Sequence, residues 1–274
     1  MDGDYAGTMA NRSEPLDTEG ILELLRAVAE DVIRPRWRSL GDGDVSEKAP
    51  GDVVTVADRE AEIRLTAELA AAFPNALVVG EEAVSADPDL LTDSHEADHV
   101  FYVDPVDGTR QFIAGSPDHA SMIGEIRRGE ITRAWILQPE RGRAYVAEKG
   151  AGARTGDGER LVADANRPGD LRGATSVEKV LRGEELAAHV NRRGICCGVD
   201  YPDLILGLQD FLLYQNPKPW DHVPGTLLVT ETGGTVGTED GEGYRGQPAA
   251  ALLATRCHEN FDDAHRRFMH ATIG

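Results

Sequence analysis

Two short apolar segments of this chain each end in acidic residues. Residues 76–82 read ALVVGEE and residues 99–109 read HVFYVDPVDGT, and apolar runs of this length are typical of buried β-strands. Residues 53–73 predict a short turn or strand followed by an amphipathic helix, ahead of the segment at 76–82. Where strands alternate with helices, ligand sites form at the carboxyl ends of the strands. The sequence therefore predicts a site at the ends of these two strands.

The rest of the chain continues this mixture of elements. Residues 17–37 repeat apolar residues at helical spacing, residues 39–52 predict a Gly/Asp-rich loop, and residues 121–154 predict an antiparallel meander. In the second half, helices are predicted at 183–193, 202–213, 221–234 and 262–273, with a strand at 194–199. We expect a flexible tail at 1–16 and two halves, 17–155 and 156–274, without a flexible linker between them.

The composition argues against several classes of partner. The 48 Asp and Glu outnumber the 28 Lys and Arg, and the net charge of −20 repels a nucleic-acid backbone. Two of the three cysteines, Cys196 and Cys197, are adjacent, and no CxxC pair or other zinc-binding spacing is present. We therefore expect all three to be reduced thiols. The chain has no apolar run of about 18 residues and no signal-peptide core. We therefore expect a cytoplasmic protein with neither a nucleic-acid nor a membrane partner.

The sequence VDPVDGT places Asp104 and Asp107 close together at one strand end, where their charges repel. The bend at Val106 frees its carbonyl as a further oxygen ligand, and the N–H groups of Gly108 and Thr109 are able to face an anion. Carboxylates and a carbonyl without nearby His or Cys favour a hard divalent cation, with Mg²⁺ first and Mn²⁺ or Ca²⁺ as competitors. A cation beside hydroxyl and N–H donors indicates cleavage of a phosphate ester, and it lets an acidic protein bind an anionic substrate.

Four motifs together resemble the inositol monophosphatase family, within the magnesium-dependent, lithium-sensitive sugar phosphatases. They are DVVTVAD (52–58), VVGEEAV (78–84), VDPVDGTRQF (103–112) and PWDHVPGTLLVTETGG (219–234), and the resemblance runs from residue 17 to residue 265. It implies a layered αβαβα sandwich. The first half is then α+β with an antiparallel sheet, the second half is α/β, and the metal site lies in the cleft between them. The resemblance also implies a homodimer.

The resemblance further implies a set of metal ligands. Two or three Mg²⁺ ions are expected, with Mn²⁺ as a substitute and Li⁺ as an inhibitor. The expected ligands are Glu81, Asp104, the Val106 carbonyl, Asp107 and, from the second half, Asp221. Glu82 follows Glu81 on a predicted strand, so it is expected on the opposite face in a structural role.

The catalytic residues implied by the resemblance are Asp58, Thr109 and Glu81. Asp58 and Thr109 form an activating pair which, with Glu81, prepares a metal-activated water for in-line attack on phosphorus. The phosphate is expected on the metals and on the N–H groups of Gly108 and Thr109. His222, beside Asp221, points about 100° away from it on a helix and is expected to be structural.

The substrate is less constrained than the reaction. The substrate-selecting positions are Cys197, Gly198 and Asp200 within ICCGVDYPD, and Tyr214, where inositol-specific members carry an acid. The leading hypothesis is a phosphomonoesterase acting on an inositol or sugar monophosphate. Histidinol phosphate is an alternative because Asp200 and Asp203 suit its ammonium group, and 3′-phosphoadenosine 5′-phosphate is another because of Tyr214, Lys218 and Trp220. A metal- or ligand-binding protein of the same fold without turnover is the non-enzyme alternative.

Overall fold

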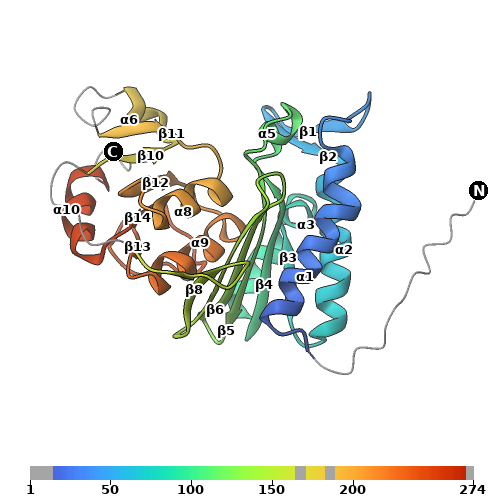
Figure 1. Ribbon diagram of the computed structural model, residues 1–274, viewed down its shortest axis with the longest axis horizontal. Helices are drawn as coiled ribbons and strands as arrows, with labels where there is room; N and C mark the ends of the chain where they lie inside the picture. The colour runs from blue at the N-terminus through green and yellow to red at the C-terminus, as the bar shows by residue number, and fades with distance from the viewer. Residues whose placement is uncertain (1–14, 164–170, 183–188, 270–274) are drawn as a thin grey trace, which may run out of the picture.

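A computed structural model describes residues 15–163, 171–182 and 189–269 of the chain. Helices and sheets alternate in the order αβαβα, as Figure 1 shows from right to left. A hydrophobic cluster fills each interface: one between the first helices and the first sheet, one between the two sheets, and one beneath the last helices. The predicted layered sandwich is confirmed.

The first helical layer consists of two helices that pack on one face of the first sheet. Helix α1 (Thr18–Val28) begins at Asp17, whose carboxylate accepts a hydrogen bond from the Gly20 amide at 2.8 Å, and it continues into the turns η1 (Ala29–Ile33) and η2 (Arg34–Arg36). Helix α2 (Val56–Ala72) begins with a capping box between Thr55 and Asp58. Both predicted helices are therefore present.

The first sheet has seven strands in the order β3-β4-β5-β6-β7-β8-β9. Strands β3 and β4 are parallel, and every later neighbour pairs antiparallel, which confirms the predicted meander. The strands are β3 (Leu77–Gly80), β4 (His99–Asp107), β5 (Ala120–Arg127), β6 (Glu130–Gln138), β7 (Arg143–Glu148), β8 (Gly152–Thr155) and β9 (Arg160–Leu161). The short helices α3 (Glu81–Ala86), α4 (Asp89–Glu96) and α5 (Thr109–Ile113) connect them.

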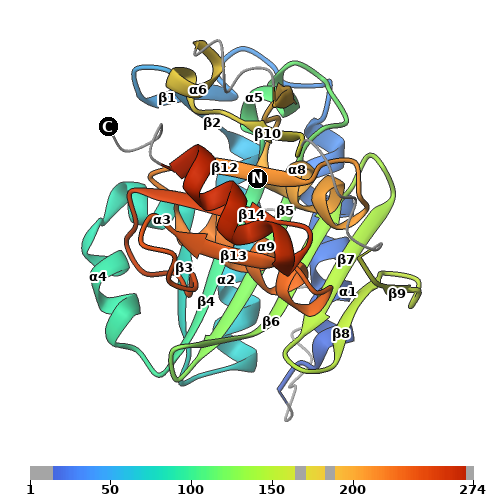
Figure 2. The same cartoon turned by 90° about the vertical axis from the view of Figure 1, so that its left-hand side faces the viewer.

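The second sheet is mixed, with five strands in the order β11-β10-β12-β14-β13. Helices α8 (Cys197–Ile205) and α9 (Pro219–Glu231) lie between the two sheets, and α10 (Phe261–Ala264) with η4 (His265–Met269) covers the outer face, as Figure 2 shows. The remaining elements are β10 (Gly173–Thr175), α6 (Glu178–Arg182), β11 (Val190–Arg193), β12 (Phe211–Gln215), β13 (Thr235–Thr238), β14 (Ala251–Thr255) and η3 (His258–Asn260). Strands of the first sheet extend to Leu161, and the boundary at 155/156 stays a prediction.

Several element predictions were wrong. Residues 45–52 were expected in a loop but belong to a hairpin of β1 (Val45–Ala49) and β2 (Asp52–Thr55), whereas the short turn or strand expected from residue 53 is the end of β2. Residues 194–196 are irregular and 197–199 begin α8, although a strand was predicted there. Residues 190–193 and 211–213 are strands in place of helix ends, because pairing with neighbouring strands outweighs their helical spacing. Residues 183–188 and most of the expected tail lie outside the described residues.

Candidate active site

A β-bulge brings the two aspartates of the opening motif together. Residues three apart on a regular strand point to opposite faces. Between Asp104 and Asp107, however, β4 advances three residues while β5 advances two, from Met122 to Ala120. The extra residue restores a common side for both carboxylates, and Asp104 and Asp107 are 1% and 7% exposed. The amide of Val106 donates to the Asp104 carboxylate at 3.0 Å and fixes the bend.

Glu81 is positioned by a buried partner on α2. The carboxylate of Glu62 accepts hydrogen bonds from the amides of Glu82 and Ala83, both at 2.8 Å, and so caps the start of α3. A Cβ on Gly80 would lie 2.1 Å from the Glu62 carboxyl carbon, so a larger residue there would push this carboxylate out of its position at the start of α3. The cap and this close approach aim Glu81 at the ends of β3 and β4.

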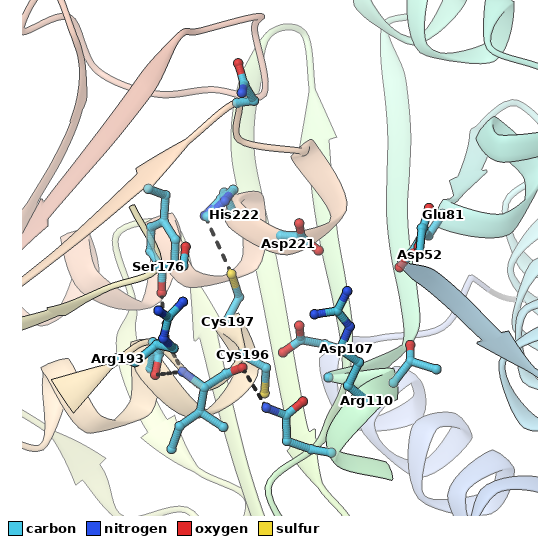
Figure 3. Close-up of a pocket in the computed structure, with 18 of the residues that line it drawn as sticks. Asp52, Glu81, Asp107, Arg110, Ser176, Arg193, Cys196, Cys197, Asp221 and His222 are labelled. Atoms are coloured by element: carbon cyan, nitrogen blue, oxygen red, sulfur yellow. Dashed lines mark hydrogen bonds between the residues drawn. The ribbon is translucent and has the colours of Figure 1, made fainter. Parts of the chain in front are cut away.

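Asp221 reaches the same place from the other half of the chain. It lies in the first turn of α9, which packs across the first sheet where Gly124 leaves room for Val223. Carboxylate oxygens of Glu81, Asp104 and Asp221 all lie within 4.8 Å of one another. Figure 3 shows Asp221 at the start of its helix, above Asp107 and facing Glu81 across the view.

The electrostatics of this cluster fit a hard cation. Burial and the neighbouring carboxylates of Glu81 and Asp107 raise the pKa of Asp104 well above its usual range, and burial beside Asp107 does the same for Asp221. Burial raises the pKa of Asp107 to about 6, against a hydrogen bond from the Gly198 amide that favours its charged form. Such mutual repulsion is relieved by a divalent cation, and oxygen donors at this spacing suit Mg²⁺.

Lys48 on β1 is a site residue that the sequence reasoning missed. Its ammonium donates to Glu81 at 2.7 Å and to Glu82 at 2.8 Å. The predicted opposite-face placement of Glu82 was wrong, because the strand ends at Gly80 and both glutamates begin α3. Burial raises the pKa of Glu82 to about 7 despite the Lys48 contact. The sequence did not mark Lys48 or Glu62 as site residues, because Lys48 lay in a predicted loop and Glu62 was one of several acids on a predicted helix.

Asp58 and Thr109 are in contact. The Thr109 hydroxyl donates to one oxygen of Asp58 at 3.0 Å, and the Thr55 amide donates to the other at 2.9 Å. Burial raises the pKa of Asp58, although the hydrogen bonds from Thr55 and Thr109 favour its charged form. Gly108, at φ +85°, turns the chain between the bulge and Thr109. Thr109 thus has an anchored acceptor and faces the acidic cluster.

A cavity of about 550 Å³ extends from these acids toward the second half. Cys197, Asp200 and Tyr214 line it, whereas Gly198 lies behind the wall and donates its amide to Asp107. Asp200 is 1% exposed and accepts hydrogen bonds from the Ile195 amide at 3.2 Å and the Tyr214 hydroxyl at 3.1 Å. Its carboxylate therefore braces the wall, and the expected contact between Asp200 and a substrate ammonium loses its basis.

The αβαβα layers, with an acidic cluster between the two sheets, define the class of this chain as the layered sugar phosphatases. The chain belongs to the inositol monophosphatase family, which matches residues 17–271.

Two relatives show the range of names in this family. The inositol-1-monophosphatase of Rhizobium meliloti is 31% identical over 241 residues, 84% of this chain and 87% of that protein. The putative Nus factor SuhB of Neisseria meningitidis is 30% identical over 206 residues, 71% of this chain and 77% of that protein.

Solved structures agree with the fold. The IMPase of Thermotoga maritima superposes with a TM-score of 0.75 at 24% identity and covers 89% of this chain and 93% of its own. The suhB protein of Bartonella henselae superposes with a TM-score of 0.71 at 28% identity and covers 92% of this chain and 98% of its own.

Within the described residues, no helix is long and apolar enough to cross a membrane.

Proposed function

We propose that this protein is a metal-dependent phosphomonoesterase that hydrolyses the phosphate ester of a small polyol, an inositol or sugar monophosphate. The observation that carries the proposal is the convergence of Glu81, Asp104 and Asp221 beside the Thr109–Asp58 hydrogen bond at one end of the cavity. A water on the Thr109 side and a phosphate over the acids would be brought into contact there.

The ligands for Mg²⁺ would be Glu81, Asp104, Asp107, Asp221 and the Val106 carbonyl. A divalent cation in such a site supplies charge neutralisation for a phosphoryl group and activates water. Lys48 already holds Glu81 and Glu82, so it keeps the cluster compact whether or not the site is filled. Mn²⁺ is expected to substitute, and Li⁺ to inhibit.

The protein's own residues orient the water and receive its proton. Because the Thr109 hydroxyl donates to Asp58, its lone pair is left to accept a hydrogen bond from an attacking water. Asp58 cannot turn away from Thr109, since Thr55 holds its second oxygen. Glu81, at the edge of the cluster, is placed to take the proton. The N–H groups of Gly108 and Thr109 face the phosphate.

The cavity wall favours a polyol as the alcohol part of the substrate. Away from the acids, the described lining includes hydroxyl, amide and guanidinium groups, from Ser176, Gln215, Asn216, Arg193 and Arg110, beside the apolar Val53 and Ile195. The ring of Tyr214 is 7% exposed and packs against Tyr201 and His222, so it offers little surface for stacking an adenine. This supports a hydroxyl-rich ester over 3′-phosphoadenosine 5′-phosphate, and the occupied Asp200 weakens the case for histidinol phosphate.

The test is phosphate release from inositol 1-phosphate, fructose 1,6-bisphosphate, histidinol phosphate and 3′-phosphoadenosine 5′-phosphate, with Mg²⁺ or a chelator. We expect Mg²⁺-dependent release, fastest with an inositol or sugar ester, and loss of release in Asp104→Asn. Asp93→Asn is the matched control, an exposed aspartate on α4 that should leave the rate unchanged. A nucleotide or histidinol winner would replace the substrate assignment. No phosphate release from any of the four esters would favour a binding protein without turnover.

A further inference from the structure

A second group of ligand atoms adjoins the acidic cluster. The Cys197 thiol, a carboxylate oxygen of Asp221 and a ring nitrogen of His222 all lie within 4.8 Å of one another. These residues do not form a recognisable zinc-binding motif in the sequence. Cys197 begins α8, whereas Asp221 and His222 lie in the first turn of α9. The packing of these two helices brings the three side chains together. Figure 3 shows Cys197 and His222 linked, with Asp221 on their cavity side.

The distances are close to those of a bound zinc ion. The Cys197 sulfur lies 3.9 Å from Nδ1 of His222. With zinc–sulfur and zinc–nitrogen bonds of about 2.3 and 2.1 Å at a tetrahedral angle, these two atoms would be about 3.6 Å apart. The sulfur and the nitrogen therefore need to approach by only about 0.3 Å, while the Tyr201 hydroxyl has to give up its contact with Nδ1.

The imidazole is held ready as a ligand. His222 is 3% exposed, so its ring is held inside the protein. Three tyrosine rings, from Tyr201, Tyr214 and Tyr244, surround it and fix its plane. Nδ1 is the ring nitrogen nearer to Cys197, and it also lies 2.9 Å from the Tyr201 hydroxyl, so it is the nitrogen that a metal beside the thiol would use.

We propose that Cys197, His222 and Asp221 form a zinc site that is distinct from the Mg²⁺ ligands and shares only Asp221 with them. Sulfur and nitrogen donors prefer Zn²⁺ to Mg²⁺, and three protein ligands leave the fourth position to water from the cavity. On binding, the Cys197 S–H bond breaks, a sulfur–zinc bond forms, and the proton passes to solvent. Zn²⁺ takes the lone pair of Nδ1, and the Tyr201 hydroxyl keeps its proton and gives up its contact with that nitrogen.

The shared ligand makes zinc an inhibitor. A metal on the Cys197 side competes with the hard-cation cluster for the Asp221 carboxylate. Micromolar Zn²⁺ therefore reduces phosphate release at saturating Mg²⁺. This inhibition depends on the proposed phosphatase activity, whereas zinc binding itself does not.

Binding is tested with Co²⁺ added to the metal-free full-length protein. Cobalt bound to a thiolate gives a near-ultraviolet charge-transfer band, which Zn²⁺ should then abolish by displacing the cobalt. We expect the band in wild type and in the matched thiol variants Cys196→Ser and Cys257→Ser, and its loss in Cys197→Ser. His222→Gln should weaken cobalt binding more than about tenfold. Absence of the band in wild type, or its survival in Cys197→Ser, would overturn the site.

Inhibition is tested by titrating Zn²⁺ into the phosphate-release assay, with each variant scaled to its own zinc-free rate. The half-inhibiting concentration should rise at least tenfold in Cys197→Ser and stay unchanged in Cys257→Ser. Equal zinc sensitivity in wild type, Cys197→Ser and His222→Gln would mean that zinc acts elsewhere. If no substrate is turned over, the cobalt band still decides the binding site, so the two proposals fail separately. Thermal unfolding of each variant confirms that it folds.

Discussion

Replacing Asp107 with Asn should stabilise the metal-free protein at neutral pH. The pKa of this carboxyl is raised from 3.8 to about 6, so its ionised form is disfavoured in the fold. At about 1.36 kcal/mol per pKa unit, the charge costs at most about 3 kcal/mol above pH 7. Asn keeps an acceptor oxygen for the Gly198 amide and carries no charge. The unfolding temperature in chelator at pH 8 should therefore rise by about 6 to 12 °C.

The advantage of Asp107→Asn should shrink as the pH falls. The folded protein holds the Asp107 proton more tightly than the unfolded chain does, so this carboxyl stops being destabilising as the pH falls through 6 toward 3.8. At pH 5 about half of the cost remains. Two buried histidines act in the opposite direction: burial lowers the pKa of His119 to about 4 and of His222 to about 3, so acid favours the unfolded chain. Comparing the two proteins at each pH removes that common contribution.

The assay is thermal or urea unfolding of wild type and Asp107→Asn from pH 8 to pH 5, in chelator and in saturating Mg²⁺. With Mg²⁺ the wild type should become the more stable of the two proteins, because its Asp107 carboxylate binds the metal and the variant has no carboxylate there. The reasoning fails if the variant is no more stable than wild type in chelator at pH 8, or if the difference does not depend on pH.

Three further changes test the site. Thr109→Val removes the hydroxyl that donates to Asp58, and it should lower kcat about 100-fold or more while Mg²⁺ binding, measured by calorimetry, is unchanged. Thr109→Ser, which keeps the hydroxyl, is the control. A normal kcat in Thr109→Val would refute the water-orienting role. Gly80→Ala places a Cβ against the Glu62 carboxyl and should weaken Mg²⁺ binding, whereas Gly243→Ala, with no atom within 4 Å of the new Cβ, should not. Tyr214→Phe removes the hydroxyl that donates to Asp200 and should cost about 1 kcal/mol in urea unfolding and raise KM more than it lowers kcat; unchanged stability would show that the brace is idle.

The acids of the site could be predicted because their signal is local. The sequence predicts the apolar segments that lead into Glu81 and Asp104, and it predicts the helix that carries Asp221. The bulge was not predictable from alternation alone, since a spacing of three on a regular strand would have sent Asp107 to the other face. The family motifs point to acids that the structure brings together, without this geometry. The bulge explains why that spacing works.

The supporting contacts were lost to sequence reasoning because they join distant segments. The hairpin of β1 and β2 reads VSEKAPGDVVT and has no long apolar run, so only its pairing reveals it as strands and brings Lys48 to Glu81. Glu62 is one acid among several on α2, and nothing local marks it as the cap of α3. The stretch 194–199 looked like a strand because Ile195 and Val199 are apolar, yet Val199 is buried within α8.

Two glycines without functional side chains set the distance between the two halves of the site. A Cβ on Gly124 would lie 2.6 Å from Val223, and one on Gly198 would lie 2.3 Å from Ala120, so both helices of the middle layer touch β5 through glycine. These approaches let Asp221 reach Asp104 and let the Gly198 amide reach Asp107. They also bring the start of α8 against α9, which places Cys197 beside His222. One pair of close packings thus sets both the acidic cluster and the thiol–imidazole pair, and links them through Asp221.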